Sequence, residues 1–562
     1  MLMNFINIFS RQQSNSEDYD IVEDKKNIGE NGTLQLSEDE VGDIRLVLFS
    51  HLCRDAPIDK IERLLNIYFS QITDENKEEM ITDLFVIIFE KRDCRGGEGE
   101  KLLFRQLFDN ARSHYGKIAN DLVSVIPTYG SWMDMWQLAT NENDEFTTAI
   151  IKICSEQIKL DVIASNEGRD GDITLCGKWT PSEGTKHYRR LHNIMTNYQR
   201  MINPGSTALQ RDYRKTIGTL RSKSNNIERL MCAKKFAEIK PKGTPSVCAL
   251  KNRKAFLNIS LDKEKELDWE KGNRFPNDED RVKCRQNWLE SIAKGEIKGG
   301  QLDPMTLVKI VTSTTDKDET DLINCQWNDL VKKVRGQIAK AIEDGYDPMN
   351  NIIPMIDRSG SMSGTPELAA IGLGILLAEV CNPKFGNTVI TFANNPQIIQ
   401  LDPRLSFSDR VKHVIRFEAG YNTDFEKAMI KVCKIIKKKN LTQDELPALC
   451  ILTDEQMNAG DMFGYSTTVD EGVKQRFIEL GNEMHGIPFE RPRTVHWNLR
   501  ADTDGYPVQA HENNVQAITS YSASMLDLIL TGKPAPTPYE TMRRKIDGER
   551  YDAVREIVKR NL

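Results

Sequence analysis

The C-terminal part of the chain alternates short apolar runs with helical patterns, and this alternation limits the fold more than any other feature. After Tyr346, β-rich runs such as NIIPMID, GNTVITFAN and PALCILTD are separated by helical stretches such as PELAAIGLGILLAEVC. Apolar strands that alternate with helices predict a mostly parallel sheet covered on both faces. We therefore predict a doubly wound, Rossmann-like α/β domain over residues 346–535, followed by a C-terminal helix over residues 536–562.

The preceding part of the chain has a different periodicity. In DKIERLLNIYFSQI, the apolar residues Ile61, Leu64, Leu65 and Tyr68 fall on one helical stripe, and several later stretches repeat this spacing. A long series of amphipathic helices without strand patterns predicts a solenoid or an irregular helical array over residues 43–345. No strict sequence period occurs, so a consensus repeat is not indicated.

Length, apolar runs and cysteine usage set broader limits. A chain of 562 residues is too long for one core and predicts two to four domains. Residues 1–42 are mostly polar and acidic, which predicts a disordered tail. No run approaches the roughly 18 apolar residues of a membrane span. The first residues, MLMNFINIF, lack the basic region of a signal peptide.

The 11 cysteines are scattered, without a C-x-x-C pair. Such a pattern predicts reduced thiols, not a disulfide framework or a zinc site. We therefore expect a cytoplasmic protein, while a nuclear or viral-factory location stays open.

Charge is distributed unevenly along the chain. Residues 185–255 contain 17 Lys and Arg against 3 Asp and Glu, a net charge of +14, whereas the whole chain carries −7. This asymmetry predicts contact either with a polyanion or with an acidic surface.

Within this basic segment, Tyr188, Tyr198 and Tyr213 are interspersed among the cations. Basic groups neutralise phosphates and aromatic rings can stack on unpaired bases, so the segment predicts nucleic-acid binding. The alternative is a set of solvated or docked helix faces. The candidate contact residues are Arg189, Arg190, Arg211, Arg214, Lys215, Arg221, Lys223, Lys234 and Lys235.

Oxygen-bearing side chains gather where two predicted strands end. In IIPMIDRSGSMSG, Asp357 ends the first strand, and Ser359 and Ser361 follow at alternate positions. Asp454 ends PALCILTD, and Thr423 precedes the helix of DFEKAMIK. Ligands of doubly wound sheets bind at the carboxyl ends of the strands. A site made only of hard oxygen ligands favours Mg²⁺ or Mn²⁺.

These five positions resemble the metal-ion-dependent adhesion site of von Willebrand factor A domains. The resemblance implies that Ser359 and Ser361 bind the ion directly and that Thr423 does so in one state. It implies that Asp357 and Asp454 act directly or through water, and that a protein partner donates a carboxylate. The alternative is a degenerate site whose side chains only cap the following helix.

An enzyme is the less favoured interpretation. A phosphatase of the haloacid-dehalogenase type would need aspartate where Ser359 stands. A nucleophile elbow needs serine between its glycines, where this chain has Met362. A metal-dependent hydrolase remains an alternative.

The helical region carries its own motifs. RGGEGE is more typical of a turn than of a nucleic-acid motif when it occurs once, and the aromatic residues of YGSWMDMW are spaced as helix core. The motifs that carry a family resemblance are RDCRGGEGEKLLF, YGSWMDMW, KWTPSE and YRKTIGTLR. Through them the chain resembles an uncharacterised DUF2828-type family that joins a helical region to a C-terminal A domain. This layout is similar to that of the TROVE/Ro proteins, in which HEAT-like helices join an A domain.

The resemblance to TROVE/Ro implies RNA as a ligand. We therefore predict a non-catalytic protein that binds RNA through its helices and a partner through its metal. The alternative is a protein-interaction scaffold that binds no nucleic acid.

Overall fold

The structure is a computed structural model of the whole chain. It describes residues 27–28, 34–224, 226–259, 273–343, 351–380, 385, 387–392, 395–417, 425–455, 469–502, 505–529 and 536–562.

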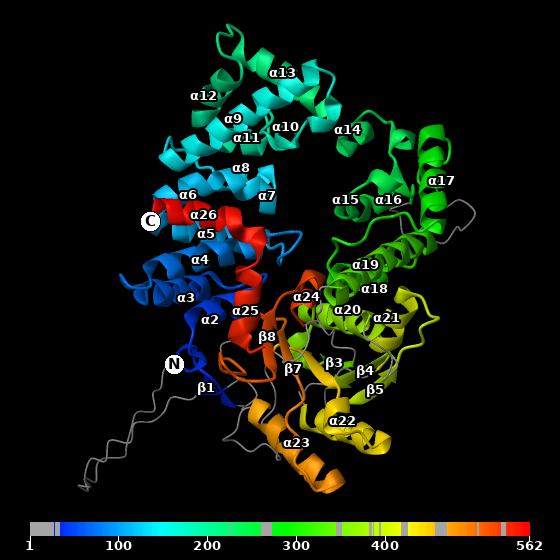
Figure 1. Cartoon of the computed structure of the whole chain (residues 1–562). Coiled ribbons are helices and arrows are strands. Elements are labelled where there is room, and N and C mark those ends of the chain that lie inside the picture. Colours follow the sequence, from blue (N-terminus) through cyan, green and yellow to red (C-terminus); the bar gives the residue numbers. More distant parts are fainter. Residues whose placement is uncertain are drawn as a thin grey trace, which may run out of the picture.

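A six-stranded mixed sheet forms the C-terminal half, which confirms the predicted α/β architecture (Figure 1). The strand order is β5-β4-β3-β6-β7-β8, and only β5 runs antiparallel to its neighbour. The strands are β3 (Ile352–Asp357), β4 (Thr388–Phe392), β5 (Gln397–Gln400), β6 (Ala448–Thr453), β7 (Thr494–Asn498) and β8 (Val515–Thr519).

Both faces of this sheet are covered. One face packs against α22 (Phe425–Lys439) and α23 (Val469–His485), in a core that includes Ile353 and Met355 of β3. The other face packs against α20 (Thr365–Val380), and there Ile352 and Ile356 belong to a core that continues into the N-terminal helices. Because side chains alternate along a strand, one strand serves both cores.

The N-terminal region is an arc of helices, and both ends of the arc contact the sheet domain (Figure 1). Its helices are α2 (Ile44–His51), α3 (Ile58–Ser70), α4 (Lys77–Arg92), α5 (Lys101–His114), α6 (Gly116–Leu122), α7 (Ile126–Tyr129), α8 (Trp132–Leu138), α9 (Glu145–Asn166), α10 (Cys176–Trp179), α11 (Lys186–Arg190), α12 (His192–Ile202), α13 (Leu209–Lys223), α14 (Ile227–Cys232), α15 (Ser246–Lys251), α16 (Arg253–Phe256), α17 (Glu279–Ala293), α18 (Pro304–Ser313) and α19 (Lys317–Glu343). The predicted apolar stripe of α3 is buried, as expected for an amphipathic helix.

The two ends of the arc are fixed by different contacts. At the first end, α2 packs beside β8, and the Thr519 hydroxyl donates to the Ser50 carbonyl. At the other end, α18 crosses α20 where a Cβ on Gly372 would lie only 2.8 Å from the Pro304 Cβ. Glycine at position 372 therefore permits the close approach of the two helices.

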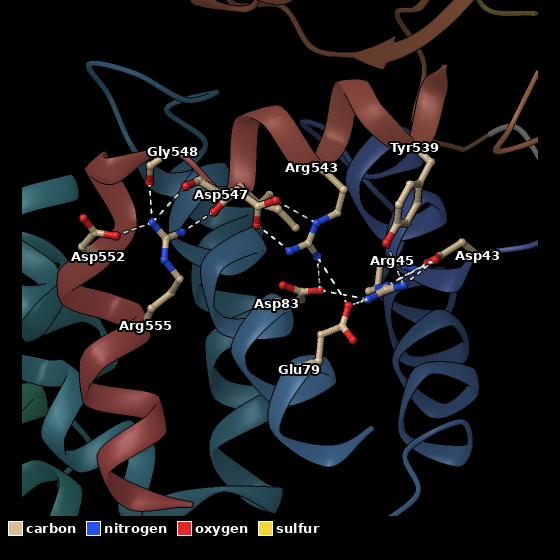
Figure 2. Close-up of polar contacts among 11 residues, drawn as sticks. Asp43, Arg45, Glu79, Asp83, Tyr539, Arg543, Asp547, Gly548, Asp552 and Arg555 are labelled. Atoms are coloured by element: carbon tan, nitrogen blue, oxygen red, sulfur yellow. Dashed lines mark hydrogen bonds and ion pairs between the residues drawn. The ribbon is translucent and has the colours of Figure 1, made fainter. Parts of the chain in front are cut away.

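The C-terminal helices α25 (Pro538–Ile546) and α26 (Asp552–Asn561) return from the sheet domain to α2, α4 and α6. Figure 2 shows the polar contacts at this return. The Asp83 carboxylate accepts hydrogen bonds from both Arg45 and Arg543, and the Tyr539 hydroxyl lies 3.2 Å from Arg45 Nη2. The last segment is therefore not a separate appendage, because it joins the sheet domain to the first helices.

Part of the predicted tail is folded. Residues 34–42 include α1 (Glu38–Val41), whose Val41 is buried, and Leu36 forms a β-bridge with Tyr506 of the sheet domain. Most of the remaining tail lies outside the described residues. No helix of the described part of the chain is long and apolar enough to cross a bilayer.

Candidate functional site: an oxygen-rich edge of the sheet

The two predicted aspartates come together because β3 and β6 are neighbours. The strands run parallel, with Ile356 opposite Leu452, so Asp357 and Asp454 emerge at the same edge. Both residues are fully buried. The sequence-based prediction that these carboxylates share one edge is confirmed by the register of the strands.

A short turn holds the two serines beside Asp357. The Asp357 carboxylate accepts hydrogen bonds from the Ser359 amide at 2.8 Å and from the Thr453 hydroxyl at 2.7 Å. The Ser359 and Ser361 hydroxyl oxygens lie 3.0 Å apart. The turn is fixed by Met362, which points into the core, before α20 begins at Thr365.

The electrostatics of this edge favour a cation. Burial, together with the nearby charge of Asp454, raises the pKa of Asp357 to about 7. The same two causes raise the pKa of Glu455 to about 8. The Arg500 side chain already brings one positive charge to this edge, since its Nη1 lies 3.2 Å from the Asp454 carboxylate.

The residues present fit a hard divalent ion. Two carboxylates and two hydroxyls are the oxygen donors that Mg²⁺ and Mn²⁺ prefer. Among the described residues no group of three or more His, Cys, Asp and Glu side chains could hold a metal, so the hydroxyls are essential to this candidate. Thr423, the fifth predicted ligand, lies outside the described residues.

Other residues of the site were missed by the sequence analysis. Arg358 is buried, forms an ion pair with Glu367 at 2.9 Å and donates to the Phe417 carbonyl at 2.6 Å. Arg358 thereby fixes Phe417, which is the last described residue before the segment that contains Thr423. Thr453 and Arg500 were also missed. Only the position of Thr453 directly before Asp454 gave a signal in the sequence.

The basic segment is divided between structural and exposed cations. Arg190 donates to two backbone carbonyls of the neighbouring α8 region, at 2.8 and 2.6 Å, and Arg221 donates to carbonyls around α10. Lys223 donates to the Ser165 carbonyl at 2.7 Å. These three predicted contact residues support the packing of the helices. The exposed candidates are Arg189, Arg190, Arg211, Arg214, Lys215, Lys234 and Lys235, so Arg190 is both exposed and structural.

Two tyrosines suggested as stacking residues belong to the core. Tyr198 and Tyr213 are buried, and their rings pack edge to face at 6.2 Å. The Tyr198 hydroxyl lies 3.2 Å from the Thr180 hydroxyl, and the Tyr213 hydroxyl donates to the Pro181 carbonyl. The suggestion that they stack on bases was therefore wrong, because their apolar rings are already covered by protein.

Comparisons with known proteins support an uncharacterised family. Residues 145–338 match a domain of unknown function, DUF2828, and residues 351–560 match another, DUF7788. The chain is also similar to "Uncharacterized protein L728" of Acanthamoeba polyphaga mimivirus, at 27% identity over 473 residues, which cover 80% of this chain and 76% of the relative. Together the two domain matches support a DUF2828-type chain and assign no activity.

Proposed function

We propose that this chain is a non-catalytic binding protein with a von Willebrand A-like domain. Its oxygen-rich edge binds Mg²⁺ or Mn²⁺ and, through it, a carboxylate of a protein partner. The observation that carries the proposal is the meeting of Asp357, Ser359, Ser361 and Asp454 at one strand edge. Two carboxylates and two hydroxyls, each binding through one oxygen, fill four of about six coordination positions, so a metal held here keeps positions open for a partner.

Replacing Ser359 with alanine should weaken Mg²⁺ or Mn²⁺ binding by at least about tenfold, because one direct oxygen ligand is lost. Isothermal titration of the full chain measures the effect. Ser363 is the matched control: it is exposed in the same turn and lies outside the D-x-S-x-S positions. Unchanged affinity in Ser359→Ala, or an equal loss in Ser363→Ala, would place the metal elsewhere.

Asp357→Ala is a less informative variant than Ser359→Ala. The carboxylate also satisfies a buried hydroxyl and an amide, so its removal is expected to destabilise the strand end as well as the site.

The same proposal assigns RNA to the exposed cations of α11–α14, by analogy with the HEAT-like helices of TROVE/Ro proteins. Arg211 and Arg214 support it, with side chains 73% and 62% exposed. Both also lie beside a carboxylate, Asp212 and Glu183 respectively. These exposed pairs are weak, so phosphates can compete for the cations.

Reversing the charges of Arg211, Arg214 and Lys215 to glutamate should weaken RNA binding for all sequences alike. For the unmodified chain we expect log K to fall with log salt at a slope of about −3 to −5, since each phosphate on a single strand contributes roughly −0.7. The triple variant should flatten that slope. Filter binding of a single-stranded RNA at several salt concentrations measures both.

The matched control reverses three exposed lysines on α22, Lys434, Lys437 and Lys438, on the far side of the sheet (Figure 1). It changes the net charge equally and should leave RNA affinity largely unchanged. If both triple variants lose affinity equally, or if neither does, the RNA assignment fails and the scaffold interpretation replaces it.

A further inference from the structure

A large cavity lies where the helical arc meets the sheet domain. Its volume is about 1110 Å³, and it is lined by the α4–α5 loop, the start of α8, α10, α15, α18, α19 and the turn at residues 522–524. The motifs RDCRGGEGEK, YGSWMDMW and KWTPSE, which are far apart in the sequence, all contribute to its wall. This volume is ample for a small organic ligand.

The loop at residues 93–100 is a fixed wall of the cavity. A Cβ on Gly97 would lie 2.0 Å from the Glu90 carbonyl oxygen, so only glycine fits there. The Cys94 amide donates to the Tyr129 carbonyl at 3.1 Å, and the Glu100 amide donates to the Lys91 carbonyl at 2.7 Å. The Ser524 hydroxyl of the sheet domain donates to the Gly97 carbonyl. The wall is therefore preformed by contacts from both halves of the chain.

The lining carries a surplus of positive charge. Arg95, Lys101, Arg105 and Lys333 line the cavity, and within the described residues none of them has an ion-pair partner. Four of the acidic lining residues have ion pairs: Arg54 contacts both Glu100 and Asp303, Arg92 contacts Asp134, and Lys91, behind the lining, contacts Glu98. With Asp55, the lining holds five carboxylates against six cations, so the surplus is one positive charge. An anionic ligand would balance the surplus.

Arg92 is a buried cation of the cavity wall and is paired within the protein. Its side chain is only 2% exposed, and its Nε and Nη2 both donate to the Asp134 carboxylate, at 3.0 and 2.7 Å. Its Nη1 is buried and has no hydrogen-bond partner within the described chain. Because this nitrogen is buried, the exposed cations of the lining, and not Arg92, are the groups that can contact an anion in the cavity.

The cavity also offers apolar surface. Leu102, Met133 and Val247 line it and remain 55%, 39% and 58% exposed, and the half-buried Trp179 lies on the same wall. A bare inorganic anion would use neither this surface nor this volume. We propose that the cavity binds a nucleoside phosphate, whose phosphate is held by the cations and whose base covers the apolar residues.

Isothermal titration of the full chain with AMP, adenosine and inorganic phosphate tests the proposal. The titrations contain EDTA, so that the phosphate cannot be held through a metal at the sheet edge. AMP should bind at least about tenfold more tightly than either fragment, since only AMP uses both the cations and the apolar wall. Adenosine binding as tightly as AMP, or no AMP binding up to millimolar concentration, would overturn the proposal.

The variant Arg95→Ala/Lys101→Ala should weaken AMP binding at least tenfold, because it removes two exposed cations of the cavity without opening the core. The matched control, Lys117→Ala/Lys159→Ala, removes two exposed lysines on α6 and α9 that do not line the cavity. Equal affinities in the two double variants would contradict the site.

The charge-reversed variant of Arg211, Arg214 and Lys215 should keep its full AMP affinity, since those residues do not line the cavity. An equal loss of AMP and RNA binding in that variant would instead place the nucleotide on the exposed basic surface and refute the cavity site. A failure of the RNA assignment alone would leave the cavity proposal intact.

Discussion

Replacing Lys91 with alanine should destabilise the chain by about 3–5 kcal/mol, the cost of removing one partner from a buried ion pair. Lys91 and Glu98 are both 0% exposed, and Lys91 Nζ donates to Glu98 at 2.5 Å and to the Phe49 carbonyl at 2.7 Å. Glu90 is buried beside them. Burial alone lowers the pKa of Lys91, but the two carboxylates outweigh it, so that its pKa is raised.

This loss is a large fraction of the roughly 5–15 kcal/mol by which a folded domain is stable. We expect little soluble protein from Lys91→Ala, and an early unfolding transition in guanidinium for what is recovered. Lys117→Ala, an exposed lysine on α6, is the control and should stay within about 0.5 kcal/mol of the unmodified chain.

The double variant Lys91→Met/Glu98→Gln adds a second check. It removes both charges of the pair together, so it should be more stable than Lys91→Ala. If Lys91→Ala and Lys117→Ala unfold at the same guanidinium concentration, the buried pair does not contribute the expected roughly 3–5 kcal/mol to stability.

Ending the chain at residue 535 should prevent stable folding of both halves. The truncation removes α25 and α26, whose residues Met542, Ile546, Tyr551, Val554 and Val558 are each at most 2% exposed. At about 1.5–3 kcal/mol for each buried side chain, the loss reaches roughly 8–15 kcal/mol as an upper figure. It would also uncover apolar surface on α4 and α6.

Solubility, circular dichroism and limited proteolysis of the truncated chain measure this effect. A soluble product with the protease pattern of the full chain would show that the C-terminal helices are not needed to hold the halves together.

Single variants locate the contribution of the C-terminal helices more finely. Arg550→Ala leaves the fully buried Asp93 carboxylate without its guanidinium partner and should be clearly destabilising. Arg560→Ala removes a 69% exposed partner of Asp121 and should be nearly neutral. Equal stability of the two variants would argue against a structural role for the Asp93 contact.

The sequence alone determined the features that are encoded over short distances. The alternation of apolar runs after Tyr346 predicted the sheet, and Ile61, Leu64 and Tyr68 predicted the buried stripe of α3. The placement of Asp357 and Asp454 at one edge also followed, because parallel strands bring their carboxyl ends together. Each of these inferences uses a period of two or 3.6 residues, or one rule of sheet topology.

Only the tertiary structure decided which polar residues are buried and which cations are free. The local sequence around Asp93 is typical of an exposed helix end, yet Asp93 is fully buried, because the chain returns to it at Arg550 and to the nearby Gly97 at Ser524. In the same way, Arg221 and Lys223 have local sequences like that of Lys215, yet they support neighbouring helices while Lys215 is exposed. Such contacts depend on the path of the whole chain, and local periodicity carries no information about residues hundreds of positions away.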